Sequence, residues 1–109
     1  MPQRLRYKEL YNSSAAGNGT WMQLDSRYGE QPYRNISVNL VSGDTVLIEA
    51  TAVDNPGVDK SFLTTLDSSK ITTLTTITAS GNYSITGPWA FIRAVKTGTA
   101  GTAVVEGFI

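Results

Sequence analysis

The stretch NISVNLVSGDTVLIEATAV, residues 35–53, contains two apolar runs separated by a polar turn. In residues 35–40 every second side chain is apolar, which is the period of a half-buried β-strand. Residues 42–44 read Ser-Gly-Asp, a composition typical of tight turns, and a second strand-like run occupies residues 45–53. The stretch therefore predicts a β-hairpin at the centre of an all-β fold.

Strand-like runs continue on both sides of this stretch, with turn residues between them. Fourteen Thr strengthen this interpretation, since β-branched side chains favour strands over helices. Two of the runs, 89–96 and 102–108, predict a second hairpin around residues 97–101. The number and spacing of the runs predict a β-sandwich or jelly roll of eight to nine short strands. The further strands expected are 4–11, 19–25, 60–66, 70–78 and 82–85.

The region 60–78 carries a mixed signal. Its apolar side chains include three- and four-residue spacings, which imitate a helix. Seven Thr within 64–78 argue against a helix, because their branched side chains crowd each helical turn. We therefore predict two strands here, near 60–66 and 70–78.

The first 19 residues differ from the rest, and we expect two parts, an N-terminal arm and hinge (1–19) and a β-sandwich domain (20–109). The arm alternates Arg4, Leu5, Arg6, Tyr7 and Lys8, followed by a hinge rich in Gly, Asn and Ser. One possibility is that the arm adds a strand to a neighbouring subunit. The other is that residues 4–11 form the first strand of the chain's own sandwich.

Composition removes several classes of function from consideration. The chain of 109 residues has no Cys and no His, so thiolate chemistry, imidazole bases and their metal sites are absent. Nine basic residues balance nine acidic ones, which predicts neither a nucleic-acid nor a membrane partner. The N-terminus has no signal-peptide pattern, so we expect a protein made in the cytoplasm. We predict no enzymatic activity, no cofactor and no metal.

The carboxylates form no visible catalytic constellation. Most are expected to serve as solvated turn residues, namely Asp25, Glu30, Asp44, Asp54, Asp59 and Asp67. Glu49 and Glu106 lie within expected strands, where they point outward or pair with Arg93. Residues 54–59 cluster oxygen ligands but lack the spacing and closing Glu of a known calcium loop, so a turn is favoured.

Five aromatic residues admit two interpretations. They could form a sugar-stacking platform, as in a carbohydrate-binding module, or they could be buried in the core and at interfaces. Burial is favoured, since their spacing does not place the rings on one surface. The five are Trp21, Tyr28, Tyr33, Tyr83 and Trp89.

The C-terminal stretch GPWAFIRAVKTGTAGTAVV, residues 87–105, resembles the last strand pair of small β-sandwich virion proteins of tailed bacteriophages. Residues 19–53, with a Trp, a polar loop, an alternating strand and an SGDTV turn, are similar to the same proteins. The resemblance implies a structural virion role, first that of a capsid decoration (cement) protein. It leaves open a tail or head–tail joining protein, and from another class a carbohydrate-binding module remains the alternative.

A virion role implies an assembly partner, either the major capsid protein or another virion protein. The apolar C-terminus beside a strand pair rich in Trp, Phe, Ile and Val predicts a homo-oligomer, most simply a homotrimer. The resemblance implies that it is assembled in the host cytoplasm and located in the virion. Arg93 is expected on a solvated face, bonded to a carboxylate or paired across a subunit contact. The expected interface comprises the five arm residues named above together with Trp89, Phe91, Arg93, Phe108 and Ile109.

Overall fold

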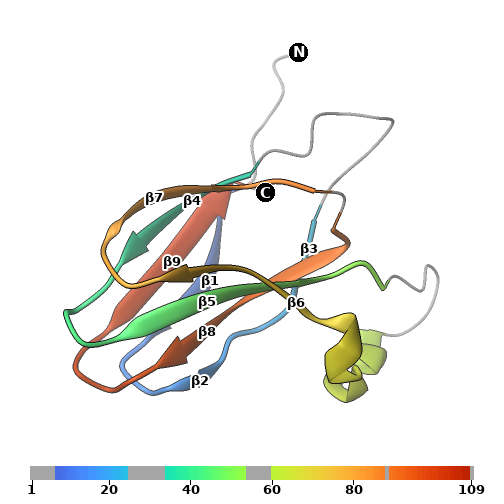
Figure 1. The fold of residues 1–109 in the computed structure, drawn as a ribbon, viewed down its shortest axis with the longest axis horizontal. Helices are drawn as coiled ribbons and strands as arrows, with labels where there is room; N and C mark the ends of the chain where they lie inside the picture. Colours follow the sequence, from blue (N-terminus) through green and yellow to red (C-terminus); the bar gives the residue numbers. More distant parts are fainter. Residues whose placement is uncertain (1–6, 25–33, 54–59, 88, 109) are drawn as a thin grey trace, which may run out of the picture.

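The protein is a sandwich of two antiparallel β-sheets (Figure 1). The computed structural model describes residues 7–24, 34–53, 60–87 and 89–108. One sheet contains, in spatial order, β1 (Tyr7–Ser13), β9 (Ala103–Phe108), β4 (Arg34–Asn39) and β7 (Gly81–Ile85). The other contains β2 (Gly17–Asn18) and β3 (Met22–Gln23), which both pair with β8 (Phe91–Thr97), followed by β5 (Thr45–Thr51) and β6 (Thr72–Ile77). The predicted all-β sandwich is confirmed.

The strand order is that of a jelly roll. Because β2 and β3 pair with the same strand, they count as two segments of one strand, which leaves eight strands. The first of these pairs with the last (β1 with β9), and the second with the seventh (β2 and β3 with β8). The third pairs with the sixth (β4 with β7), and the fourth with the fifth (β5 with β6). The chain is thus one long hairpin, bent between β5 and β6 and rolled into two layers.

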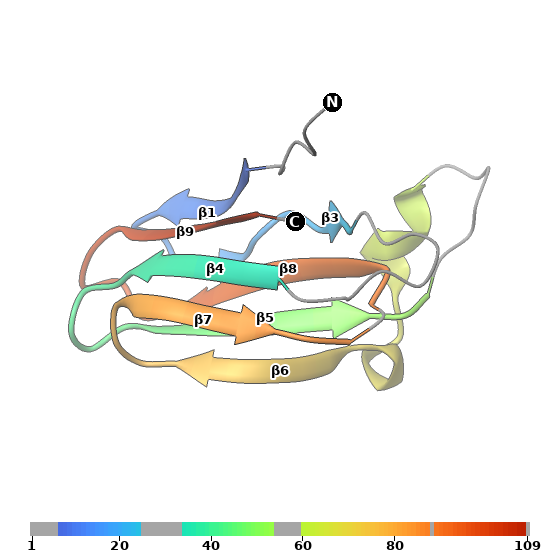
Figure 2. The ribbon, with the colours of Figure 1, turned by 90° about the horizontal axis from the view of Figure 1, so that it is seen from above.

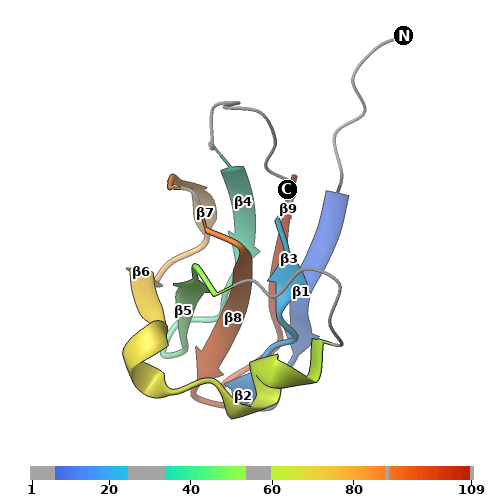
Figure 3. The same ribbon diagram turned by 90° about the vertical axis from the view of Figure 1, so that its right-hand side faces the viewer.

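Both predicted hairpins are wrong. β4 and β5 belong to different sheets, and so do β8 and β9, so each of the two turns crosses from one layer to the other (Figure 3). Alternation defines which face of a strand is buried, and that face looks inward whether the next strand lies beside it or opposite it. Figure 2 shows the crossovers β4–β5 and β8–β9 at the same end of the sandwich.

The predicted strand at 60–66 is also wrong, while the one near 70–78 is confirmed as β6. The chain instead forms two short 3-10 helices, η1 (Lys60–Thr65) and η2 (Ser68–Lys70). Asp67 caps η2, because its Oδ1 accepts a hydrogen bond of 2.9 Å from the Ser69 amide. The helix-like apolar spacing was therefore the correct signal for the connection between β5 and β6, which contains η1 and η2.

The described part of the N-terminal segment belongs to the sandwich. β1 pairs with β9 over its whole length, and β2 pairs with β8. Leu10 is 3% exposed and packs into the core, which ties β1 to the interior. Of the two possibilities for 4–11, residues 7–11 thus follow the second, the strand of the chain's own sandwich. Arg4, Leu5 and Arg6 lie outside the described residues.

The core lies between the two sheets and is built from one face of each strand. Its side chains are aliphatic, which agrees with the alternation seen in the sequence. No helix among the described residues is long and apolar enough to cross a membrane. The fully buried members include Ile36, Val38, Val46, Ile48, Ala50, Ile77, Ile92, Ala94, Ala103 and Val105.

Candidate functional site

A bulge interrupts the strand formed by β2 and β3. Asn18 lies opposite Val95, and the Gly19 amide donates a hydrogen bond of 2.6 Å to the Ala94 carbonyl. Beyond the bulge, the pairing resumes with Met22 opposite Ile92. Two residues, 20 and 21, therefore face the single residue 93 of β8. A bulge of this kind re-aims side chains, and here it places an indole over the outer face of the sheet.

Arg93 is held between an acidic and an aromatic neighbour on that outer face. Its Nε and Nη2 lie 2.9 and 2.8 Å from Oε1 of Glu49, its direct cross-strand neighbour in β5. Its guanidinium carbon lies 4.5 Å from the centroid of the Trp21 ring. The expected pairing of Glu49 with Arg93 is confirmed, and it occurs within one chain. Glu49 thus holds the Arg93 guanidinium in place, and Arg93 in turn packs against the indole of Trp21 in the bulge.

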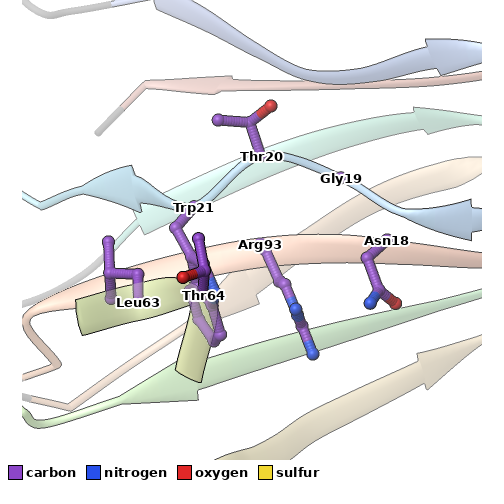
Figure 4. Close-up of a pocket in the computed structure, with 7 residues that line it drawn as sticks. All are labelled: Asn18, Gly19, Thr20, Trp21, Leu63, Thr64 and Arg93. Carbon is purple, nitrogen blue, oxygen red and sulfur yellow. The ribbon is translucent and has the colours of Figure 1, made fainter. Parts of the chain in front are cut away.

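A pocket of about 480 Å³ opens beside this group. Figure 4 shows the side chains of Asn18, Trp21 and Arg93 extending to the same side of the bulged strand, with Leu63 and Thr64 of η1 beside the indole. The pocket combines an apolar wall from Trp21 and Leu63 with polar groups from Asn18 and Arg93. This is the composition expected of a small-molecule site.

A second pocket, of about 350 Å³, lies on the other side of residues 18–20. It opens between β1 and the bulged strand, and shares Asn18, Gly19 and Thr20 with the first. The sequence pointed to Trp21 and Arg93 in this region but not to the polar residues around them. Only the pairing register of β2, β3 and β8 brings these residues together, and that register is not visible in the sequence.

The remaining expected interface residues are scattered. Phe91 is 2% exposed, so within the monomer it is a buried residue. Trp89 packs against the core and its indole N–H donates to the Thr86 carbonyl at 3.0 Å. Lys8 is half-buried on β1. The backbone of Tyr7 pairs with that of Phe108, while Ile109 lies outside the described residues.

The large apolar side chains that the structure describes are almost all covered within the monomer. In the described part of the chain, Val41 is the one large hydrophobic residue that is exposed, at 42%. The apolar C-terminal strands that motivated the expectation of a trimer are therefore largely buried in their own sandwich.

The aromatic residues do not form a common platform in the described ranges. Trp21 lies on the outer face of one sheet, whereas Tyr83 and Trp89 pack against the core. The Tyr83 hydroxyl donates a hydrogen bond of 2.6 Å to the Ala79 carbonyl. Tyr28 and Tyr33 lie outside the described residues.

The turn position of Asp44 predicted a solvated side chain, and this prediction is wrong. Asp44 is 2% exposed, and its Oδ1 accepts a hydrogen bond of 2.9 Å from the Ala100 amide while its Oδ2 accepts one of 3.1 Å from the Gly101 amide. Lys96 lies 3.1 Å from the same Oδ2. The Ala100 amide, then Lys96 and the Gly101 amide, hold the pKa of Asp44 below its ordinary value, while burial acts in the opposite direction.

The other carboxylates form no site in the described ranges. Asp67 caps η2, and the Ser69 amide and hydroxyl lower its pKa. Glu106 lies directly opposite Glu9 rather than Arg93. Across residues 7–24, 34–53, 60–87 and 89–108, no group of three or more acidic side chains could hold a metal ion. Asp25, Glu30, Asp54 and Asp59, and with them the possible calcium loop at 54–59, lie outside these ranges.

Three comparisons with known proteins found no match to this chain. No family model matches it, and neither a curated protein nor a solved structure does.

Proposed function

We propose that this chain is a structural protein of a bacteriophage virion, namely a capsid decoration protein that bridges neighbouring capsomers. The proposal starts from the resemblance of residues 19–53 and 87–105 to small virion proteins. Its main structural support is the flank formed by β6 and β7, called here the uncharged flank. β6 is the edge strand of one sheet and β7 the edge strand of the other, and they lie on the same side of the sandwich (Figures 2 and 3).

The uncharged flank lacks the usual protection of a free sheet edge. Edge strands carry unpaired backbone N–H and C=O groups, and monomeric proteins commonly guard them with charged residues or Pro. Residues 71–92, which include both strands, contain no charged residue at all, and neither strand contains Pro. β1, the other edge of the sheet that ends in β7, carries Lys8 and Glu9 instead, whereas β2 and β3, the other edge of the β6 sheet, are uncharged as well. A flank of this kind fits coverage by a protein neighbour.

The proposed mechanism is mechanical. A rigid sandwich contacts a capsid subunit or a second copy of itself through its uncharged flank, and the particle's symmetry repeats that contact. A contact burying about 1,000 Å² or more is sufficient for a specific interface. The net charge of zero is compatible with a protein partner. The open edges, rather than exposed apolar side chains, are what a homotrimer would use.

Quantitative mass spectrometry of purified particles tests this function. A decoration protein is expected in copy numbers comparable with those of the major capsid protein, because it occupies every equivalent junction. A tail or head–tail joining protein, the nearest alternative, would be present in far fewer copies per particle. Absence of the chain from purified particles would refute both.

A further inference from the structure

We propose that the pocket beside the bulge binds a neutral saccharide unit. The pocket is the one of about 480 Å³ lined by Asn18, Gly19, Thr20, Trp21, Leu63, Thr64 and Arg93. Its volume lies within the roughly 300–1,000 Å³ typical of small-ligand sites. This inference is independent of the virion role, since the pocket lies at the β2–β3 edge of the sheet and β6 lies at the other edge.

The lining matches the two-sided chemistry of a pyranose ring. A sugar offers apolar C–H groups together with hydroxyls that both donate and accept hydrogen bonds. The indole of Trp21 and the side chain of Leu63 supply apolar surface. Asn18 supplies an amide on an exposed position of β2, with a donor and an acceptor on one side chain.

Hydrogen-bond donors at the pocket fit a ligand rich in oxygen. The half-buried Trp21 lines the pocket and carries an indole N–H. Indole N–H groups usually find a partner when buried. Arg93 uses Nε and Nη2 for Glu49, and guanidinium has five N–H donors in all, so further donors remain. Ligand hydroxyls would satisfy these groups.

The charge balance of the site favours a neutral ligand over an anionic one. The Arg93 cation is already paired with the Glu49 carboxylate, and the two side chains are 16% and 15% exposed. An anion would have to compete with Glu49 for the guanidinium and would be repelled by that carboxylate. A sugar hydroxyl carries no charge, so it can accept a hydrogen bond from Arg93 without displacing the Glu49 carboxylate.

The site is also organised before a ligand arrives. The bulge sets the direction of Trp21, and Arg93 covers the indole on one side at 4.5 Å. Arg93 is in turn fixed by Glu49 on the neighbouring strand. Preorganisation reduces the entropic cost of binding. A single sugar unit is nevertheless small, so a dissociation constant on the order of 1 mM is expected.

Saturation-transfer NMR on the unmodified protein tests for binding. The probes are methyl glucoside, methyl galactoside, N-acetylglucosamine, maltose and lactose, with glucuronate as the anionic comparison. At least one neutral probe is expected to bind at millimolar concentration and more tightly than glucuronate. No transfer to any neutral probe, or transfer to glucuronate alone, would overturn the proposal.

Two pairs of matched variants locate the site. Trp21→Phe and Asn18→Ala are each expected to weaken binding of the neutral probe at least about fivefold, since each removes a hydrogen-bonding group. Trp89→Phe and Asn82→Ala, which change the other Trp and an exposed Asn on β7, should leave it unchanged. Equal losses in both members of a pair would place the sugar elsewhere and refute this site.

Glu49→Gln tests the charge argument separately. It leaves the Arg93 cation without its carboxylate while preserving the size of the side chain. Affinity for glucuronate relative to the neutral probe is expected to rise between about 1.5- and 5-fold, the range of a partly exposed ion pair. An unchanged ratio would show that the ion pair does not set the preference for neutral ligands.

Discussion

Nζ of Lys96 lies 3.1 Å from Oδ2 of Asp44, and the two side chains are 0% and 1% exposed. Lys96 also donates to the carbonyls of Ser14, at 3.1 Å, and Gly98, so all three of its ammonium protons have acceptors. Asp44 in turn binds two amides of the β8–β9 crossover. This buried pair therefore joins three connections at one end of the sandwich: β1–β2, β4–β5 and β8–β9.

Removing the cation is expected to destabilise the protein strongly. Lys96→Met keeps most of the side-chain volume but leaves a buried carboxylate without its counter-charge. Breaking one side of a buried pair costs about 3–5 kcal/mol of unfolding free energy. Urea unfolding measures this cost, with Lys70→Met as control, because Lys70 is exposed in η2 and should change stability by less than about 0.5 kcal/mol. Similar effects of the two variants would contradict a structural role for the pair.

Stability is expected to fall in acid partly through Asp44. Its pKa in the folded chain is lower than the ordinary value of 3.8, so folding favours the ionised form. The resulting stabilisation is complete above the unfolded pKa and is lost as the pH falls through the lower, folded pKa. Urea midpoints measured from pH 6 downward should therefore decline below about pH 4. Asp44→Asn should show a smaller acid decline than the unmodified protein, and an equal decline would count against this assignment.

A side chain at Gly98 is expected to destabilise the protein more than one at Gly43. The φ of Gly98 is +91°, and a Cβ built there would contact Oδ1 of Asp44. Gly43 has a similar φ of +100° but no atom within 4 Å of its Cβ position. Gly43→Ala should therefore cost only backbone strain, about 1–3 kcal/mol. Gly98→Ala should cost at least about 1 kcal/mol more, because the Asp44 hydrogen bonds must also shift. Equal thermal stabilities of the two variants would show that the contact is relieved easily.

The strands were largely predictable from the sequence, but their partners were not. The alternation in residues 35–40 and 45–53 correctly gives β4 and β5 with their buried faces. It cannot distinguish a hairpin from a crossover, since both bury the same side chains. What distinguishes them is the pairing of strands far apart in sequence, such as β1 with β9, for which one sequence contains no signal.

The candidate site was predictable only in its strongest element. Pairing with Arg93 was one of the outcomes expected for Glu49 and Glu106, and Glu49 does pair with it. The bulge at Thr20 and Trp21 depends on a register shift between two strand segments, which composition does not encode. For Asp44 the sequence-based prediction of its environment was wrong. Its turn position predicted solvation, yet two amides and Lys96 replace the water around it.

Adding charge to the uncharged flank is expected to block assembly without unfolding the protein. Thr76 is exposed on β6, and Thr76→Lys places a cation on that edge strand. Asn12→Lys adds the same charge to β1, an edge strand of the other sheet on the far side of the sandwich. Particles assembled in the presence of each variant should contain at least about tenfold less of the Thr76→Lys protein than of the Asn12→Lys protein. Equal incorporation would exclude β6 from the contact.

Hydrogen–deuterium exchange of the chain, free and in purified particles, tests whether a protein neighbour covers the open edges of β6 and β7 in the virion. Their amides, Thr72–Ile77 and Gly81–Ile85, should exchange more slowly in particles than in the free protein, while those of β1 should exchange at similar rates. Unchanged exchange in β6 and β7, with protection confined to β1 or absent altogether, would contradict this coverage.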